Sequence, residues 1–361
     1  MPQNLTSKFE TYRNNVLKMP FANLPWADMS ALKSLRIGKK FKNIVVVGMG
    51  GSSLGAKAIS AVLKNSKMIF LDNVDPDFVH QVLKEITSNK TLFVLISKSG
   101  ETLETLSLAP LLFAKIKPPH NYLVITDDAS SPLGLLAKRN KIPLFISPAD
   151  VAGRFSALSI VGLLPCALAG IPISRILEGA RKTPWKQSFR LACEQVLQFK
   201  KGKRITVIFP YCELLNKFAD WYIQLLSESI GKTRLIGITP VKAIGVKDQH
   251  SQLQLFLDGP DDKFFILIKV KYTEHDSKIP GTNMTLKKLF DAEYEGVKSA
   301  FLKKKKPFWE IGMPEISPET VGELLFFFEL QIAFLGLLLK VNTFNQPAVE
   351  LSKKITKSLL K

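Results

Sequence analysis

The sequence predicts an α/β protein with two doubly wound parallel sheets, a helical N-terminal arm and a C-terminal helix. In two stretches of the chain, short apolar strands alternate with helix-length segments, which is typical of parallel sheets covered on both faces. The 361 residues exceed the usual limit of one hydrophobic core, and 46% of them are hydrophobic. We expect the arm to span 1–40, the two domains 41–180 and 181–345, and the last helix 346–361.

The predicted strands follow one another in a regular order. Five strands, the size of a doubly wound sheet, belong to the first domain: Ile44–Val47, Met68–Leu71, Leu92–Ile96, Tyr122–Ile125 and Leu144–Ile146. The second domain has Ile205–Phe209, Arg234–Ile238 and Phe264–Val270, with Phe308–Ile311 as a further candidate. A helical region around residues 171–185 is expected to carry the junction between the two domains.

The sequence shows neither a membrane-spanning segment nor a metal-binding motif. The apolar segment Leu324–Leu339 contains Glu329 and Gln331 and falls short of the ~20 apolar residues that span a bilayer, so we expect a buried core helix. The first residues lack the charged-then-apolar pattern of a signal peptide. No second cysteine or histidine lies at metal-ligand spacing from any of the three cysteines, Cys166, Cys193 and Cys212. We expect a cytoplasmic protein with reduced thiols, no membrane contact and no metal.

The formal net charge of +19 attracts anions in general, including nucleic acids and phosphorylated metabolites. The densest basic run, Lys303–Lys306, has no zinc-finger spacing, RNA-binding aromatic signature or helix-turn-helix pattern beside it. We therefore expect a solvated helix end and no nucleic-acid partner.

A glycine-rich turn, Gly48–Gly55, follows the first predicted strand. Glycines there let backbone N–H groups approach an anion at a helix N-terminus. A dinucleotide fingerprint would need a third glycine where Ser53 stands, and a nucleotide P-loop would need a lysine where Ala56 stands. A tight turn without any ligand remains the third interpretation.

A polar corner, Ser97–Thr102, follows the third predicted strand at the edge where open α/β sheets bind ligands. Hydroxyls from Ser97, Ser99 and Thr102, together with free N–H groups of the next helix and the charge of Lys98, suit a phosphate monoester. The simpler alternative is a capped helix, for which one hydroxyl would be enough.

These two motifs carry a resemblance to a known fold. VVVGMGGSSLG at residues 45–55 and ISKSGETLET at residues 96–105 resemble the sugar isomerase (SIS) domain, a flavodoxin-like fold that binds phosphosugars in enzymes and regulators. The resemblance implies the class of ligand but not the chemistry.

Three downstream stretches contain residues suited to proton transfer. Glu228 lies near the end of a mostly apolar helix, where partial burial would make it a usable base, although a surface glutamate is the plain alternative. His250 sits in a polar turn, and an imidazole is a natural carrier for proton transfer, although a lone histidine is often structural. The third stretch, Asn342–Lys354, opens the last helix.

With the first two motifs, these stretches resemble the glucose-6-phosphate isomerase family from about residue 44 onward. The resemblance implies an aldose–ketose isomerase that interconverts glucose 6-phosphate and fructose 6-phosphate through a cis-enediol, in glycolysis and gluconeogenesis, without metal or nicotinamide. It also assigns the residues. Gly50, Gly51 and Ser52 match the family's sugar-binding loop, and Ser97, Lys98, Ser99 and Thr102 match its phosphate site. Arg154 matches the cation that stabilises the enediolate, and Glu228 matches the base. The ring-opening residues are matched by His250, in the Gln249–His250 turn, and by Lys353, seven residues beyond Gln346.

The sequence departs from the family pattern at Ala348 and Ser352, which stand where glycines are common. The chain is also short for the family. Family members are usually dimers with the histidine contributed across the interface, so the resemblance implies a homodimer. A dual phosphoglucose/phosphomannose isomerase and a non-catalytic phosphosugar-binding SIS regulator are the alternatives, and a nicotinamide dehydrogenase is a more remote one.

Overall fold

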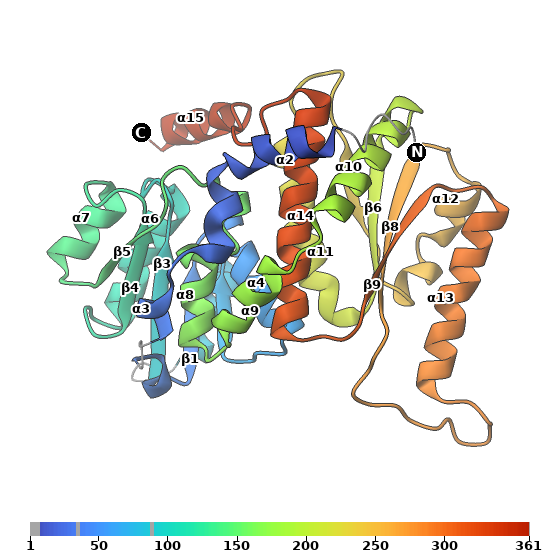
Figure 1. The fold of residues 1–361 in the computed structure, drawn as a ribbon. Coiled ribbons are helices and arrows are strands. Elements are labelled where there is room, and N and C mark those ends of the chain that lie inside the picture. The colour runs from blue at the N-terminus through green and yellow to red at the C-terminus, as the bar shows by residue number, and fades with distance from the viewer. Residues whose placement is uncertain (1–7, 34–36, 87–89, 361) are drawn as a thin grey trace.

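The first domain is built on a five-stranded parallel sheet (Figure 1). The structure, a computed structural model, describes residues 8–33, 37–86 and 90–360. The strand order is β2-β1-β3-β4-β5, the flavodoxin-like order of a doubly wound fold. The strands are β1 (Asn43–Val47), β2 (Met68–Leu71), β3 (Thr91–Ile96), β4 (Tyr122–Thr126) and β5 (Leu144–Ile146). The five predicted strands are thus confirmed to within a residue at each end.

The second sheet has four parallel strands in the order β7-β6-β8-β9. They are β6 (Ile205–Tyr211), β7 (Thr239–Lys242), β8 (Lys263–Val270) and β9 (Phe308–Met313). The predicted strand at Arg234–Ile238 is wrong, because β7 begins only at Thr239. The Thr233 hydroxyl accepts the backbone N–H groups of Leu235 and Ile236, and this local turn competes with sheet formation.

Helices cover both faces of each sheet, as the predicted fold class requires. On the outer face of the first sheet lie α5 (Pro76–Glu85), α6 (Leu103–Lys115) and α7 (Pro132–Arg139). The outer face of the second sheet is covered by α12 (Leu253–Asp258) and α13 (Leu286–Lys303). The Lys303–Lys306 run lies at the end of α13, where Lys304 pairs with Asp258 at 2.8 Å and Lys306 lies 3.7 Å from Asp261.

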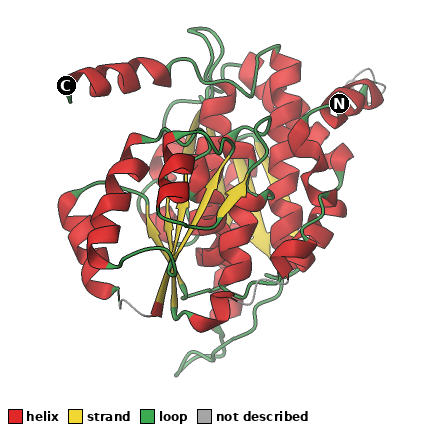
Figure 2. Ribbon diagram, turned by 90° about the vertical axis from the view of Figure 1, so that its left-hand side faces the viewer, coloured by secondary structure: helices red, strands yellow, loops and turns green. Residues whose placement is uncertain are grey.

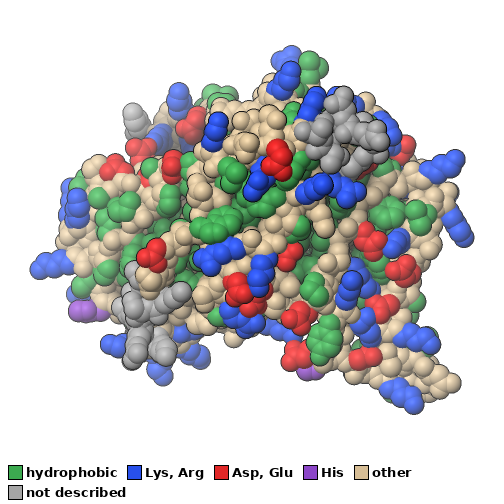
Figure 3. Space-filling model, viewed as in Figure 1, with side chains coloured by type: hydrophobic (Ala, Val, Ile, Leu, Met, Phe, Trp, Pro, Cys, Tyr) green, Lys and Arg blue, Asp and Glu red, His purple; other side chains and the backbone are tan. Residues whose placement is uncertain are grey.

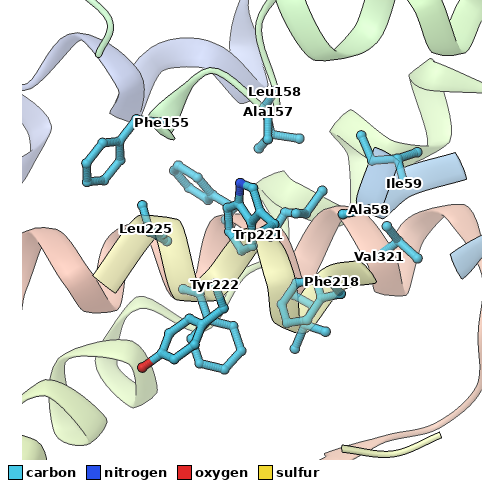
Figure 4. Packing of buried hydrophobic residues seen from close by; sticks show 14 of the residues in the cluster. Ala58, Ile59, Phe155, Ala157, Leu158, Phe218, Trp221, Tyr222, Leu225 and Val321 are labelled. Carbon is cyan, nitrogen blue, oxygen red and sulfur yellow. The ribbon is translucent and has the colours of Figure 1, made fainter. Parts of the chain in front are cut away.

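A shared helical layer lies between the inner faces of the two sheets (Figure 1). It consists of α4 (Leu54–Val62), α8 (Ile160–Leu168), α9 (Ile173–Arg181), α10 (Trp185–Lys200), α11 (Asn216–Ile230) and α14 (Pro318–Leu339). Figure 4 shows Trp221 and Leu225 of α11 among buried side chains of α4 and of residues 155–158. One continuous core therefore fixes α11 relative to the first sheet.

The ends of the described chain differ in how they pack. The N-terminal part contains α2 (Phe9–Leu17), α3 (Ser30–Lys33) and 3-10 turns at Pro20–Trp26 and Ile37–Lys40, and the Phe9 ring lies 5.5 Å from that of Phe189. The last helix, α15 (Val349–Leu359), has only exposed residues and projects from the body of the protein (Figure 2).

The helix α14 is long and apolar enough to cross a membrane, but 83% of its most apolar window is buried inside the protein. It packs closely against α9 through two glycines. A Cβ atom on Gly322 would lie 1.8 Å from the Ile176 carbonyl oxygen, and one on Gly179 would lie 1.8 Å from the Glu319 carbonyl oxygen. The predicted buried core helix is thus confirmed.

Replacing Gly322 by alanine should destabilise the protein by about 1–3 kcal/mol, because the new methyl group forces two backbones apart. The matched control is Gly296→Ala in α13, where no atom of the described residues outside the helix's own backbone and the neighbouring residues lies within 4 Å of the new Cβ. That substitution should stabilise by about 0.5–1 kcal/mol through helix propensity. Urea unfolding curves measure both shifts, and an unchanged midpoint for Gly322→Ala would show that the helix contact is looser than described.

Candidate active site

The guanidinium of Arg154 is the buried centre of the candidate site. Arg154 lies in a 3-10 turn, η5 (Gly153–Phe155), with 2% of its surface exposed. It donates hydrogen bonds to Ser229 Oγ at 2.8 Å, Glu228 Oε2 at 3.2 Å, Gln346 Oε1 at 2.9 Å, the Asn345 carbonyl at 3.1 Å and the Thr343 carbonyl. Burial lowers the pKa of Arg154 and the charge of Glu228 opposes this shift. An arginine remains charged under both influences.

The carboxylate of Glu228 is held from two sides and still reaches solvent. One oxygen accepts from Arg154, and the other accepts from Gln224 Nε2 at 2.9 Å. Gln224 precedes Glu228 by four residues on α11, so the two side chains share one face of the helix. About a third of the Glu228 side chain, 32%, is exposed. The carboxylate is therefore oriented by two donors and open to a ligand.

Gln224 joins this carboxylate to the glycine-rich turn. A Cβ atom on Gly50 would lie 2.9 Å from Gln224 Nε2, and Gly50 has a φ of +54°, in the left-handed region. The Gln224 Oε1 atom is buried and has no hydrogen-bond partner among the residues that the structure describes. A buried acceptor in this position is available to a ligand hydroxyl.

The glycine-rich turn also touches the turn that carries Arg154. Gly50, Gly51 and Ser52 form the 3-10 turn η3 after β1. A Cβ atom on Gly51 would lie 2.4 Å from the carbonyl carbon of Gly153, so the two backbones are in direct contact. This contact sets the position of Arg154 relative to the edge of the first sheet.

The corner after β3 forms a loop that leads into α6. The buried Ser97 hydroxyl lies 2.7 Å from Thr102 Oγ1 and accepts the Thr102 N–H at 3.3 Å, so it serves the loop itself. Ser99 is exposed and Thr102 is partly exposed. Thr102, the N-cap of α6, makes no side-chain capping bond to the helix. The first N–H groups of α6 therefore suit an anion.

A small pocket connects this loop to the Arg154 turn. Ser52, Lys98, Gly153 and Ser156 are among the residues that line it. The ends of β1 and β3 and the turn η5 thus meet at one edge of the first sheet, the edge at which such sheets bind ligands.

Three predicted site residues lie apart from this group. Gln249 accepts from the Tyr211 hydroxyl at 3.1 Å and donates to Glu293 at 2.9 Å, within the second domain. His250 is exposed at the end of the 3-10 turn η7 (Lys247–His250). Lys353 pairs with Glu350 at 2.7 Å on the exposed helix α15. Within the described chain, no hydrogen bond joins them to Arg154 or Glu228.

The structure adds residues that the sequence analysis missed. Gln224 carries one signal that could have found it, the i, i+4 spacing to Glu228 on one helix. Lys232 follows the end of α11, and its ammonium donates to the Glu228 carbonyl at 2.6 Å. The carbonyl acceptors of Thr343 and Asn345 have no sequence signal, since every residue has a carbonyl.

A larger cavity, of about 670 Å³, lies elsewhere, at the carboxyl edge of the second sheet. Tyr211, Tyr272, His275 and Phe290 are among the residues that line it, and none of its described lining residues is a predicted site residue. The convergent polar groups around Arg154 favour the first-sheet edge as the reaction site in spite of its smaller pocket.

A profile described as phosphoglucose isomerase matches residues 31–243 and 284–361. The chain belongs to the phosphoglucose isomerase family. The intervening residues 244–283, which include Gln249 and His250, are outside the matched ranges.

Relatives in this family cover most of the chain. Glucose-6-phosphate isomerase of Carboxydothermus hydrogenoformans is 37% identical over 95% of this chain and 85% of its own length. The enzyme of Thermus thermophilus is 35% identical over 94% of this chain and 91% of its own length.

Solved structures agree with the fold. A Thermus thermophilus protein described as hypothetical superposes with a TM-score of 0.89 at 34% identity, covering 99% of this chain and 97% of that one. A glucose-6-phosphate isomerase from Chlamydia trachomatis has a TM-score of 0.83 at 23% identity and covers 99% and 84%. The C-terminal domain of glucosamine-fructose-6-phosphate aminotransferase from Francisella tularensis, at 16% identity, has a TM-score of 0.54 and covers 90% and 94%. The predicted pair of SIS-type α/β domains is confirmed by these likenesses.

Proposed function

We propose that this protein interconverts glucose 6-phosphate and fructose 6-phosphate. The observation that carries the proposal is the partly exposed Glu228 carboxylate, which is hydrogen-bonded to the buried Arg154. The turn that carries this arginine lines one pocket together with Lys98 of the corner after β3. The family relatives are named for this reaction. A base and a fixed cation are the two groups that an aldose–ketose isomerisation requires.

The phosphate of the substrate binds at the corner after β3. The exposed hydroxyl of Ser99 and the partly exposed hydroxyl of Thr102 donate to it, together with the first N–H groups of α6. Ser97 supports the loop through its bonds to Thr102, and Lys98 adds positive charge. An anchor at this edge leaves the sugar carbons free to extend along the η3 turn toward Glu228.

The proton transfer then runs between two adjacent carbons. Glu228 takes the proton from C2 of the open-chain aldose while the C1 oxygen gains a proton, which gives the cis-enediol. The C2 hydroxyl then gives up its proton as Glu228 returns a proton to C1, and the ketose forms. Atoms and electrons balance within the sugar, so the reaction needs no external oxidant or reductant.

Arg154 stabilises the negative charge that develops on the enediolate oxygens. Protein acceptors take all five N–H groups of its guanidinium, so Arg154 acts through a fixed positive charge that needs no reorganisation as the enediolate forms. Gln224, with its unpaired buried oxygen, is placed to accept a hydrogen bond from a sugar hydroxyl. We propose this role for Gln224 in addition to those of Gly50, Gly51 and Ser52, which line the same side.

Ring opening is assigned to His250, Lys353 and the residues beside them. These two groups lie apart from Glu228 in one chain, so a complete site requires a second copy and a different position of α15. We therefore propose a homodimer in which the partner supplies its histidine. Gln346, already bonded to Arg154, connects the catalytic cluster to the start of α15.

We further propose a cytoplasmic location with no membrane or nucleic-acid partner. The most apolar helix is occupied by core packing, and two lysines of the densest basic run face aspartates. On the face shown in Figure 3, Lys and Arg side chains are spread among Asp and Glu and form no single patch.

Two coupled assays separate the proposed reaction from its alternatives. An assay with a chelator present tests for a metal-dependent isomerase, and an assay with mannose 6-phosphate as second substrate tests for a dual-specificity isomerase.

Glu228→Gln should lower kcat by about 10³-fold, because the amide keeps the shape but cannot accept the proton. The matched control is Glu178→Gln, an exposed glutamate paired with Lys182, which should leave kcat unchanged. The measurement is the coupled assay with fructose 6-phosphate. A Glu228→Gln protein with the parent kcat would remove Glu228 as the base.

Mixed dimers test whether the histidine crosses the interface. Glu228→Gln and His250→Asn proteins, each inactive alone, are unfolded and refolded together. In a two-fold symmetric dimer with a shared histidine, each mixed dimer has one intact site, so about a quarter of the parent activity should return. If both residues act within one chain, no activity returns, and the shared site is excluded.

A further inference from the structure

The ammonium of Lys232 has contacts that the proposed mechanism does not use. Lys232 follows Gly231, the residue that ends α11. Its Nζ atom donates to the Glu228 carbonyl oxygen at 2.6 Å and to the Asn345 carbonyl oxygen. One side chain therefore bridges the backbone of the proposed base and the loop that follows α14.

The Asn345 carbonyl accepts from two cations at once. Arg154 donates to it at 3.1 Å, in addition to the bond from Lys232. The side chain of the next residue, Gln346, accepts from Arg154 at 2.9 Å. The loop 343–346 is thus held between two positive side chains from different elements.

The position of Lys232 also suits the end of a helix. The last carbonyl groups of α11 have no partners within the helix, and a lysine beyond the last turn satisfies one of them and complements the helix dipole. The carbonyl in question belongs to Glu228 itself. Holding this backbone atom limits how far the carboxylate can move.

We propose that Lys232 is a positioning residue of the isomerase. It fixes the loop 343–346 against the end of α11, so that the Glu228 carboxylate and Arg154 keep one geometry, and it adds a second positive charge beside the developing enediolate. This inference rests on the proposed function and deepens it, since it explains how the base and the cation stay aligned.

The charge of Lys232 depends on pH in a range that an assay can reach. The charged groups that face it are Arg154 from η5 and Glu228 from α11, while the loop 343–346 presents carbonyl groups. Burial, and next the charge of Arg154, lower the pKa of Lys232 to about 8, with Glu228 opposing them. Above that pH the second positive charge is lost, and kcat should fall.

Lys232→Met and Lys232→Arg test the proposal, with Lys217→Met as the matched control. Lys217 lies on α11, the helix that Lys232 follows, but it is exposed and pairs with Asp220. Lys232→Met should lower kcat by about 10–100-fold, because a misplaced base loses its alignment with the substrate. Its KM for fructose 6-phosphate should change by less than about 3-fold, since the phosphate anchor is elsewhere.

The pH profile separates the charge from a merely structural effect. The parent should lose kcat through pH 8, whereas Lys232→Arg should keep most of the parent kcat and hold it at higher pH, because arginine stays protonated. Lys217→Met should reproduce the parent profile. A parent-like kcat for Lys232→Met, or the same alkaline fall in Lys232→Met and Lys232→Arg, would overturn the proposal.

Hydrogen exchange provides a readout that does not need turnover. In Lys232→Met, but not in Lys217→Met, backbone amides of residues 343–346 and 348 should exchange faster, because the loop loses one of its two anchors. If the parent protein fails to isomerise fructose 6-phosphate, the proposed function is wrong, while faster exchange still supports the anchoring by Lys232. Unchanged exchange in Lys232→Met overturns the anchoring whatever the parent activity.

Discussion

The described site depends on one buried positive charge. An isolated guanidinium in the interior is strongly unfavourable, so Arg154 must be surrounded by acceptors. The structure supplies a carboxylate, a hydroxyl, an amide and two backbone carbonyls, drawn from α11 and from the loop after α14. Satisfying this one residue therefore brings together segments that are far apart in the sequence. The assembled geometry is also the one that isomerisation requires, with a fixed cation beside a base.

Close backbone packing at two glycines is a second constraint on the geometry of the site. Gly51 against Gly153, and Gly50 against Gln224, leave no space for a side chain. These contacts bring the turn after β1 against the turn that carries Arg154 and the helix that carries Glu228. The shared core around Trp221 holds α11 in turn (Figure 4). The proposed phosphate corner, sugar loop, base and cation thus belong to one arrangement of packed segments, which suits a reaction that depends on alignment.

The sequence predicted the first sheet well because its strands are buried on both faces. Such strands are continuous apolar runs, and β1, β3 and β4 are recognised from these runs alone. The second sheet was predicted less accurately at β7, whose described residues are partly or fully exposed and include Pro240. The alternating Ile236 and Ile238 predict a strand there, but Thr233 organises a turn, and the buried Ile238 directly precedes β7.

The site was only partly predictable for a related reason. The phosphate corner follows from strand position and residue type, whereas the roles of Arg154 and Glu228 came from the family resemblance. Gln224 and Lys232 each have a local partner, Glu228, four residues away, but the Lys232 contact with Asn345 is tertiary and has no sequence signal. The carbonyls that receive Arg154 leave no trace in residue identity. His250 and Lys353 lie outside the cluster, and a single chain does not bring them to it.

A crystal structure of the protein with fructose 6-phosphate bound tests the central claim most directly. The account predicts the phosphate at Ser99, Thr102 and the start of α6, with C1 and C2 within about 3–3.5 Å of a Glu228 carboxylate oxygen and Arg154 on the adjacent sugar oxygens. A sugar phosphate bound in the cavity beside Tyr211 and Phe290, or bound at the first sheet with its first two carbons directed away from Glu228, would contradict it.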